Sequence, residues 1–276
     1  MIKVENVSYK YKNTNHKVLE NINFSVKDGE IIAIVGQNGS GKSTIGRLIA
    51  GISKLKEGSI IIDNLDIAKN KNYKLIRDKV GIVFQNPENQ IIFNNIYDEL
   101  SFSLKNLEKT EIEDRVNTAL EQVGMLSFKE EDLYTLSLGQ KQRIVIAEVL
   151  AKNPKYIILD EPTTMIDSQG KEKIYEIIKK LKQQGYTIIC ITNLADEILL
   201  ADRTLILDNG NIAYEIERKD LIDKAYILDK FGIKQPTLLK ILTELKENKI
   251  ALELKEFTIS ELVNSLKGKI INEKSN

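Results

Sequence analysis

The segment GQNGSGKS, Gly36 to Ser43, constrains the fold more than any other part of the sequence. It follows the apolar run EIIAIV and precedes a helical pattern. It matches G-x-x-x-x-G-K-S/T in the strand-to-helix context that this pattern requires. Its glycines allow successive backbone N–H groups to face phosphate oxygens, and the start of the helix adds partial positive charge. The segment therefore predicts a nucleotide phosphate site and argues against a glycine-rich turn without a ligand.

The pattern also assigns roles within the loop. Lys42 is expected to reach the β- and γ-phosphates, and Ser43 is expected to ligate Mg²⁺. The residues expected to bind the nucleotide are Gly36, Gln37, Asn38, Gly39, Ser40, Gly41, Lys42, Ser43 and Thr44.

A second chemical element is the run YIILDEP, an apolar strand that ends in Asp160 and Glu161. Asp160 suits a direct or water-mediated contact with Mg²⁺. Glu161 suits a general base that polarises the attacking water. Taken alone, an acidic pair after a strand marks the start of a helix about as often as it marks a catalytic site. Beside the glycine-rich loop, the catalytic interpretation is favoured.

The order of the remaining patterns predicts the fold class. Short β-branched runs that predict strands lie at 2–9, 21–26, 30–35 and 58–63. Helical patterns at 42–52, 111–123, 140–152 and 170–184 alternate with apolar strands at 81–84, 156–160 and 187–192. This order predicts an α/β fold with a largely parallel, helix-flanked sheet and an N-terminal antiparallel part. The later sequence is rich in Lys and Leu, with Pro236 as a helix starter, and predicts a second small domain at 216–276.

Composition excludes several classes of partner and location. The 276 residues contain 40 basic and 40 acidic residues, so no overall field favours nucleic acid or a membrane surface. No apolar run approaches the roughly 20 residues that span a bilayer, and the N-terminus lacks a signal-peptide pattern. Cys190 is the sole cysteine, which precludes a disulfide within the chain and favours a cytosolic location.

The strand TIICIT ends at Thr192, and Asn193 follows it. In open α/β sheets, ligands bind at the carboxyl ends of the parallel strands. Asn193 is therefore expected to face the nucleotide site.

The segment LSLGQKQR, Leu136 to Arg143, resembles the LSGGQ signature of ATP-binding-cassette (ABC) ATPases. The resemblance covers about residues 1–215, with the cassette elements in the expected order. It implies a P-loop NTPase ABC cassette with a RecA-like parallel core, an antiparallel β subdomain and an α-helical signature subdomain at about 88–153. It also implies a small C-terminal α/β domain for dimerisation or regulation at 216–276. The cofactors implied are ATP and Mg²⁺.

The resemblance implies roles for further residues. Gln85 resembles the Q-loop glutamine, which contributes to catalysis and to Mg²⁺ binding. Asp167 resembles the D-loop aspartate, and Asn193 occupies the position of the switch histidine near the γ-phosphate. Tyr11 resembles the aromatic that stacks on adenine, although Tyr9 is an alternative. The residues expected to contact a partner's ATP are Ser137, Leu138, Gly139 and Gln140.

Two residues depart from the family pattern. Leu138 replaces the third signature residue, the first of its two glycines, and Asn193 replaces the histidine. Cassettes of this family dimerise head to tail, so Asn193 affects the site that contains its own Lys42, whereas Leu138 affects the partner's site. A heterodimer with a second ATPase subunit is therefore expected, and a homodimer remains possible. A third interpretation is a mainly ATP-binding subunit with weak hydrolysis.

Residues 83–107, VFQNPENQIIFNNIYDELSFSLKNL, are similar to the segment after the Q-loop in energy-coupling-factor (ECF) importers and their cobalt and nickel relatives. This similarity implies an ATPase at the cytoplasmic face of the membrane that energises uptake of vitamins or transition-metal ions. It also implies a transmembrane coupling subunit and, indirectly, a substrate-binding membrane subunit. Apolar residues that either line a groove for a membrane-subunit helix or form ordinary core are Ile91, Ile92, Phe93, Ile96 and Phe102.

The alternatives are another class of ABC transporter and a soluble ABC ATPase that acts on DNA or ribosomes. The DNA-acting class inserts a long coiled coil between the glycine-rich loop and the signature. Here Lys42 and Ser137 are 95 positions apart (137 − 42), without sustained heptads. The ribosome-acting class carries two cassettes, whereas this chain has one. Zero net charge also disfavours a nucleic acid partner.

Overall fold

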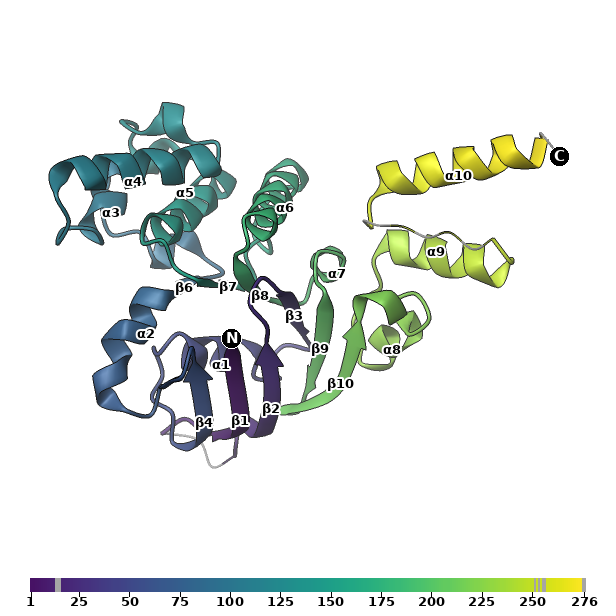
Figure 1. Ribbon diagram of the computed structural model, residues 1–276, viewed down its shortest axis with the longest axis horizontal. Coiled ribbons are helices and arrows are strands. Elements are labelled where there is room, and N and C mark those ends of the chain that lie inside the picture. Colours follow the sequence, from purple (N-terminus) through teal and green to yellow (C-terminus); the bar gives the residue numbers. More distant parts are fainter. Residues whose placement is uncertain (13–15, 251, 253, 255–256, 275–276) are drawn as a thin grey trace.

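The structure is a computed structural model that describes residues 1–12, 16–250, 252, 254 and 257–274. It contains two sheets, which lie below helices α3 to α6 in the view of Figure 1. The four-stranded sheet is antiparallel and has the order β2 (Leu19–Val26), β1 (Ile2–Tyr9), β4 (Glu57–Ile62) and β5 (Leu65–Asp66). The six-stranded sheet has the order β10 (Asn211–Glu217), β9 (Arg203–Asp208), β3 (Ile31–Val35), β8 (Thr187–Thr192), β7 (Tyr156–Asp160) and β6 (Val80–Val83).

The six-stranded sheet is parallel except for β10, which forms an antiparallel hairpin with β9. Strands β3, β7 and β8 are buried at every residue, as expected for apolar strands covered on both faces. The carboxyl ends of β3, β7 and β8 lie at one edge of the sheet and lead into the glycine-rich loop, Glu161 and Asn193. The mainly parallel core and the antiparallel N-terminal part are both confirmed.

Alternate residues of β3 enter two different cores. Ile32 and Ile34 pack with α1 (Lys42–Ile49), α2 (Tyr73–Lys79) and the antiparallel sheet. Ala33 and Val35 enter the other core, which contains the remaining helices. Helix α1 lies close against the parallel sheet, because a Cβ at Gly46 would lie 2.6 Å from Ile191 Cδ1.

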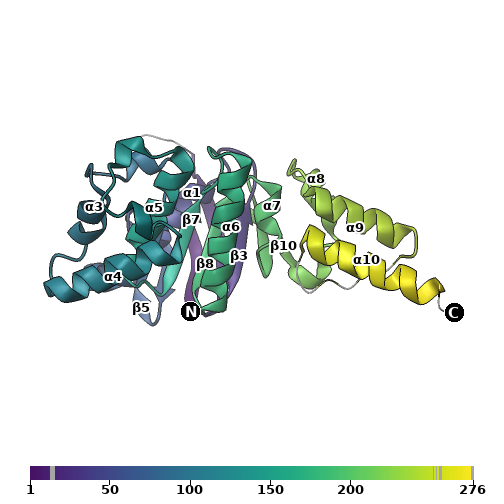
Figure 2. The same cartoon turned by 90° about the horizontal axis from the view of Figure 1, so that it is seen from above.

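The helices between β6 and β7 form a group at one side of the sheet (Figures 1 and 2). They are α3 (Ile96–Phe102), α4 (Lys109–Gln122) and α5 (Leu138–Ala151). Helix α6 (Ser168–Gln183) covers the parallel sheet, and α7 (Ala195–Ile198) follows β8. The four predicted helices are confirmed, with ends that differ from the predicted ones by at most three residues. The short helices α2 and α3 were not predicted.

The C-terminal segment continues from β10, which ends two residues beyond the predicted boundary at 215. Its helices are α8 (Ala225–Lys230), α9 (Thr237–Glu247) and α10 (Ile259–Lys274), and α9 and α10 lie side by side in both views. Pro236 directly precedes α9, as predicted. The described residues after Glu217 contain helices and no strand, so the strand component predicted for this segment is not seen in them. Residues 251, 253, 255 and 256 lie outside the described residues.

The C-terminal helices share a core with the cassette, because Leu228, Leu239 and Leu262 belong to the same buried cluster as α5 and α6. The division of the chain at about 215 and the helical subdomain at about 88–153 remain predictions. In the part of the chain that the structure describes, no helix is both long and apolar enough to cross a membrane.

Candidate nucleotide site

The glycine-rich loop joins β3 to α1 and depends on backbone conformations that favour glycine. Gly41 precedes α1 with a left-handed φ of 106°. A Cβ at Gly41 would lie 2.8 Å from the Val18 carbonyl oxygen, and a Cβ at Gly36 would lie 2.1 Å from that of Leu207. Larger residues at either position would displace the loop from neighbouring backbone.

Lys42 is the buried cation of this loop. Its Nζ donates to the carbonyl oxygens of Gly36 at 2.8 Å and of Gln37 at 3.0 Å. Burial lowers the pKa of Lys42, and the negative charges of Glu161 and Asp160 oppose that shift. Because an ammonium group has three donors, Lys42 can brace the loop and still direct a proton to an anion.

Ser43 and Asp160 come together from two elements. Ser43 Oγ, at the start of α1, donates to Asp160 Oδ1 at the end of β7 over 2.8 Å. Burial raises the pKa of Asp160, and the hydrogen bond from Ser43 opposes this shift. The pair places a hydroxyl and a carboxylate next to the loop. Their binding of Mg²⁺ stays a prediction.

Glu161 lies beside this pair and meets Gln85. Gln85 Nε2 donates to Glu161 Oε2 over 2.8 Å, and Thr164 Oγ1 hydrogen-bonds the same oxygen at 3.2 Å. The backbone of Glu161 is left-handed, with φ 51°, and its N–H donates to Ile191 O over 2.7 Å. Left-handed conformations in residues other than glycine cost about 1 kcal/mol or more and cluster at functional sites.

Asn193 faces the glycine-rich loop. Its Nδ2 donates to Asn38 Oδ1 over 2.9 Å. Asn193 Oδ1 and Ser40 Oγ are both buried, and neither has a hydrogen-bond partner among the described residues. Buried polar atoms normally have partners, so two unpaired atoms at this loop indicate a ligand with hydrogen-bonding groups.

Two tyrosines, Tyr9 and Tyr11, lie near the start of α1. Tyr11 OH and Thr44 Oγ1 are 3.0 Å apart, and Tyr11 is 36% exposed. Tyr9 packs edge-on against Tyr11, with ring centroids 5.1 Å apart, and also contacts the core between the sheets. The greater exposure of Tyr11 favours it over Tyr9 as the adenine contact.

The signature segment begins α5. Ser137 caps this helix, and Ser137 and Gln140 form a reciprocal capping box. A Cβ at Gly139 would lie 3.1 Å from Ile166 Cγ2. Asp167 caps α6 through a 2.7 Å hydrogen bond from Gly170 N, and the two helix starts line one depression. The contact of the signature with a partner's ATP stays a prediction.

Residues 19–164 match the family model described as ABC transporter. The chain belongs to the ABC transporter family. A relative from Oenococcus oeni, named Energy-coupling factor transporter ATP-binding protein EcfA1, is 40% identical over 96% of this chain and 97% of its own length. These matches confirm the ABC cassette fold and the resemblance to ECF ATPases.

Solved ABC cassettes have the same fold. The structure of cbiO1 from Clostridium perfringens, described as part of the ABC transporter complex cbiONQ, superposes with a TM-score of 0.75 at 34% identity, covering 87% of this chain and 97% of cbiO1. A dimeric cassette in a post-hydrolysis state, bound to ADP and phosphate, has a TM-score of 0.72 at 31% identity, covering 79% of this chain and 99% of that cassette. This chain is thus an ATP-binding ABC ATPase.

The ABC site contains contacts that the sequence motifs did not predict. Asn38 accepts a hydrogen bond from Asn193, and Thr164 hydrogen-bonds Glu161. Thr164 lies three residues after Glu161, a spacing that allows such a contact in a tight turn. Asn38 and Asn193 are 155 positions apart, so only the fold brings them together.

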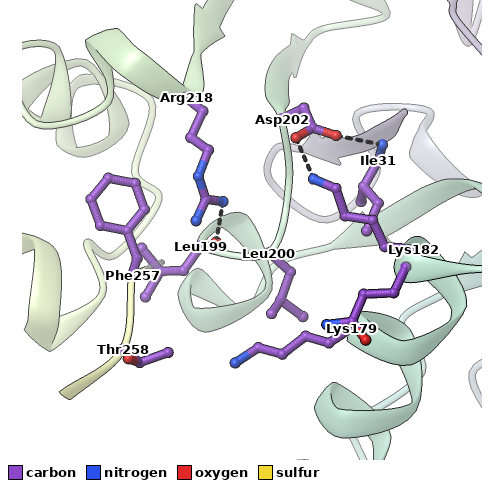
Figure 3. Close-up of a pocket in the computed structure, with 10 residues that line it drawn as sticks. Ile31, Lys179, Lys182, Leu199, Leu200, Asp202, Arg218, Phe257 and Thr258 are labelled. Carbon is purple, nitrogen blue, oxygen red and sulfur yellow. Dashed lines mark hydrogen bonds and ion pairs between the residues drawn. The ribbon is translucent and has the colours of Figure 1, made fainter. Parts of the chain in front are cut away.

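A separate cavity lies between the cassette and the C-terminal segment (Figure 3). Arg218 Nη1 donates to the carbonyl oxygens of Leu199 at 2.7 Å and of Ala201 at 3.1 Å, and its guanidinium lies over the Phe257 ring. Lys182 forms an ion pair with Asp202. Arg218 thus joins the C-terminal segment to the cassette, whereas Lys182 and Asp202 both belong to the cassette.

Proposed function

We propose that this chain binds and hydrolyses ATP to energise an ECF-type importer of vitamins or transition-metal ions at the cytoplasmic face of the membrane. The observation that carries the proposal is the arrangement of Ser43 with Asp160 and of Gln85 with Glu161 beside one phosphate-binding loop. Similarity to ECF ATP-binding proteins over nearly the whole chain supports the importer class.

The residues at the site fit ATP with Mg²⁺. Ser43, Gln85 and Asp160 supply the oxygen ligands that Mg²⁺ prefers, and Mg²⁺ usually takes few protein ligands together with phosphates and water. When bound, Mg²⁺ would neutralise charge that develops on the phosphates.

Residues of this chain carry out the other steps of ATP binding and hydrolysis. Glu161 accepts a proton from the attacking water, while Gln85 and Thr164 hold its carboxylate. Lys42 neutralises phosphate charge, and Asn193 donates to the γ-phosphate through its amide. Tyr11 stacks on the adenine.

The membrane partner we propose is a transmembrane coupling subunit. Of the five apolar residues considered for its groove, Ile96 is fully buried and belongs to the core, and Ile91 is partly buried against that core. Ile92 and Phe102 are exposed, and Phe102 packs against Phe93 with ring centroids 5.1 Å apart. These three residues form the surface on which a helix of that subunit would dock.

The two residues that depart from the family pattern, Leu138 and Asn193, give a test of this proposal. Alone, the chain is expected to hydrolyse ATP slowly, because a homodimer carries both Leu138 and Asn193 in every site. Adding a second cassette with an intact signature should raise the rate about tenfold or more, as measured by phosphate release at fixed total cassette concentration. Rapid hydrolysis by the purified chain alone would contradict the heterodimer.

Replacing Asn193 by His is expected to raise hydrolysis at this chain's own site with little change in ATP affinity. The imidazole reaches further than the amide and can carry positive charge toward the γ-phosphate. A donor that strengthens in the transition state is worth up to about 10² to 10³ in rate, of which the amide retains part. We expect a gain of about tenfold in single-turnover hydrolysis, measured in a heterodimer whose other site is silenced.

The Asn193→Ala variant serves as the comparison, and it should be slower than the unaltered chain. If the unaltered chain and the Ala and His variants hydrolysed ATP at equal rates, Asn193 would only cap the end of the strand. The gain from His should disappear when Glu161 is also replaced, because the switch residue orients the water and does not replace the base.

A further inference from the structure

A fully buried carboxyl group lies behind the nucleotide site. Glu197 is on α7, the short helix after Asn193, and its exposed fraction is 0%. None of the roles proposed above uses it. Acidic side chains are almost never fully buried without partners, so the contacts of Glu197 determine what it can do.

Glu197 contacts the two segments that carry Glu161 and Asn193. The Thr163 hydroxyl donates to Glu197 Oε1, and the Thr192 side chain lies near enough to the same carboxyl group to lower its pKa. Both threonines are fully buried. Thr163 lies two residues after Glu161, and Thr192 directly precedes Asn193. One carboxyl group therefore links both sides of the reaction site.

The backbone around these threonines leaves little freedom for independent movement. Glu161 N–H donates to Ile191 O over 2.7 Å, which ties the loop after β7 to the end of β8. Leu194 N donates to Thr192 Oγ1 over 2.8 Å, which fixes the turn that presents Asn193. A shift of either threonine would therefore move a residue of the site.

The surroundings favour the neutral form of this carboxyl group. Burial raises the pKa of Glu197 to about 7, and the charge of Glu161 adds to that rise. The neighbouring Thr163, Thr192 and Lys171 oppose this rise. Its Oε2 has no hydrogen-bond partner among the described residues. The other titratable groups around it are Tyr175 of α6, Cys190 of β8 and Asp196 of α7.

We propose that Glu197 is a positioning residue for ATP hydrolysis, which holds Thr163 and Thr192 together and so fixes Glu161 relative to Asn193. The inference rests on the proposed role of Glu161 as base. In this role, Glu197 touches neither the water nor the nucleotide. Its removal should therefore lower the rate of the chemical step and leave ATP binding intact.

The test uses the full chain assembled with a second cassette, in which Glu197 is replaced by Ala or by Gln. The Glu197→Ala variant is expected to lower kcat about 10- to 100-fold at unchanged KM for ATP, because small displacements of catalytic groups have effects of this size. Glu197→Gln should restore kcat, because its neutral amide has the same shape and accepts the hydrogen bond from Thr163.

The pH profile supplies a second readout. Below about pH 7 the neutral acid and the amide should give equal rates. Above about pH 7 the ionised form places a buried negative charge next to Glu161, so the unaltered complex should slow relative to Glu197→Gln. The control is Asp196→Asn, which neutralises the exposed neighbour on the same helix and should follow the unaltered profile.

Three results would overturn the proposal: full kcat in Glu197→Ala, equal loss in the Gln and Ala variants, or parallel pH profiles for Glu197→Gln and the unaltered chain. If thermal unfolding shows that Glu197→Ala does not fold, the pH comparison with Glu197→Gln decides. Failure of the proposed function is distinguishable, because the unaltered complex would then hydrolyse no ATP.

Discussion

Replacing Glu161 by Gln is expected to abolish ATP hydrolysis at this chain's site, by roughly 10² to 10⁴-fold, while ATP binding is preserved. The amide keeps the shape of the side chain and its contact with Gln85, but it cannot accept a proton from water. Lys42, Ser43 and Asp160 are untouched, so the phosphate site stays intact. Phosphate release and equilibrium ATP binding by the assembled complex measure the two effects separately.

Glu172→Gln is the matched control, since Glu172 is an exposed carboxylate on α6. It should leave both hydrolysis and binding unchanged. If the Glu161→Gln complex hydrolysed ATP at the unaltered rate, a different residue would have to be the base.

The second large effect is expected for Lys42→Ala, which should lower hydrolysis roughly 10² to 10³-fold and weaken ATP binding. The substitution removes a buried positive charge from the phosphate site. It also leaves the carbonyl oxygens of Gly36 and Gln37 without their donor, so the loop itself is less well held. Nucleotide affinity and thermal unfolding should both be measured.

Lys71→Ala removes an exposed lysine of the same chain and serves as its control. An ATP affinity for Lys42→Ala equal to that of Lys71→Ala would contradict the assignment of Lys42 to the phosphates.

The parts of the fold that the sequence predicts best are those with local signals. Buried parallel strands are continuous apolar runs, and the glycine-rich loop has a fixed spacing. Helix starts were placed less well, because caps decide them. Ser137 caps α5 and Asp167 caps α6, and each helix begins two residues before its predicted start. Helices α2 and α3 span only seven residues each, too few for a clear helical period.

The site was predicted as a set of residues, and the contacts between them come from the fold. Sequence motifs indicated Gln85 and Glu161 separately, but no local signal gives their hydrogen bond or the left-handed backbone of Glu161. The burial of Glu197 was even less predictable from the sequence. Within LADEI it has the sequence pattern of an exposed helix start, yet β8 and the loop after β7 bury it completely. Tertiary packing decides such positions.

ATP-driven solute uptake tests the central claim most directly. Vesicles would contain this chain, a second cassette, the coupling subunit and a substrate-binding membrane subunit, and uptake would be measured with ATP at the cassette side. We expect uptake that requires ATP and that falls to the background level with Glu161→Gln in this chain. Uptake at the unaltered rate with Glu161→Gln would contradict the claim that hydrolysis in the site of this chain energises the importer.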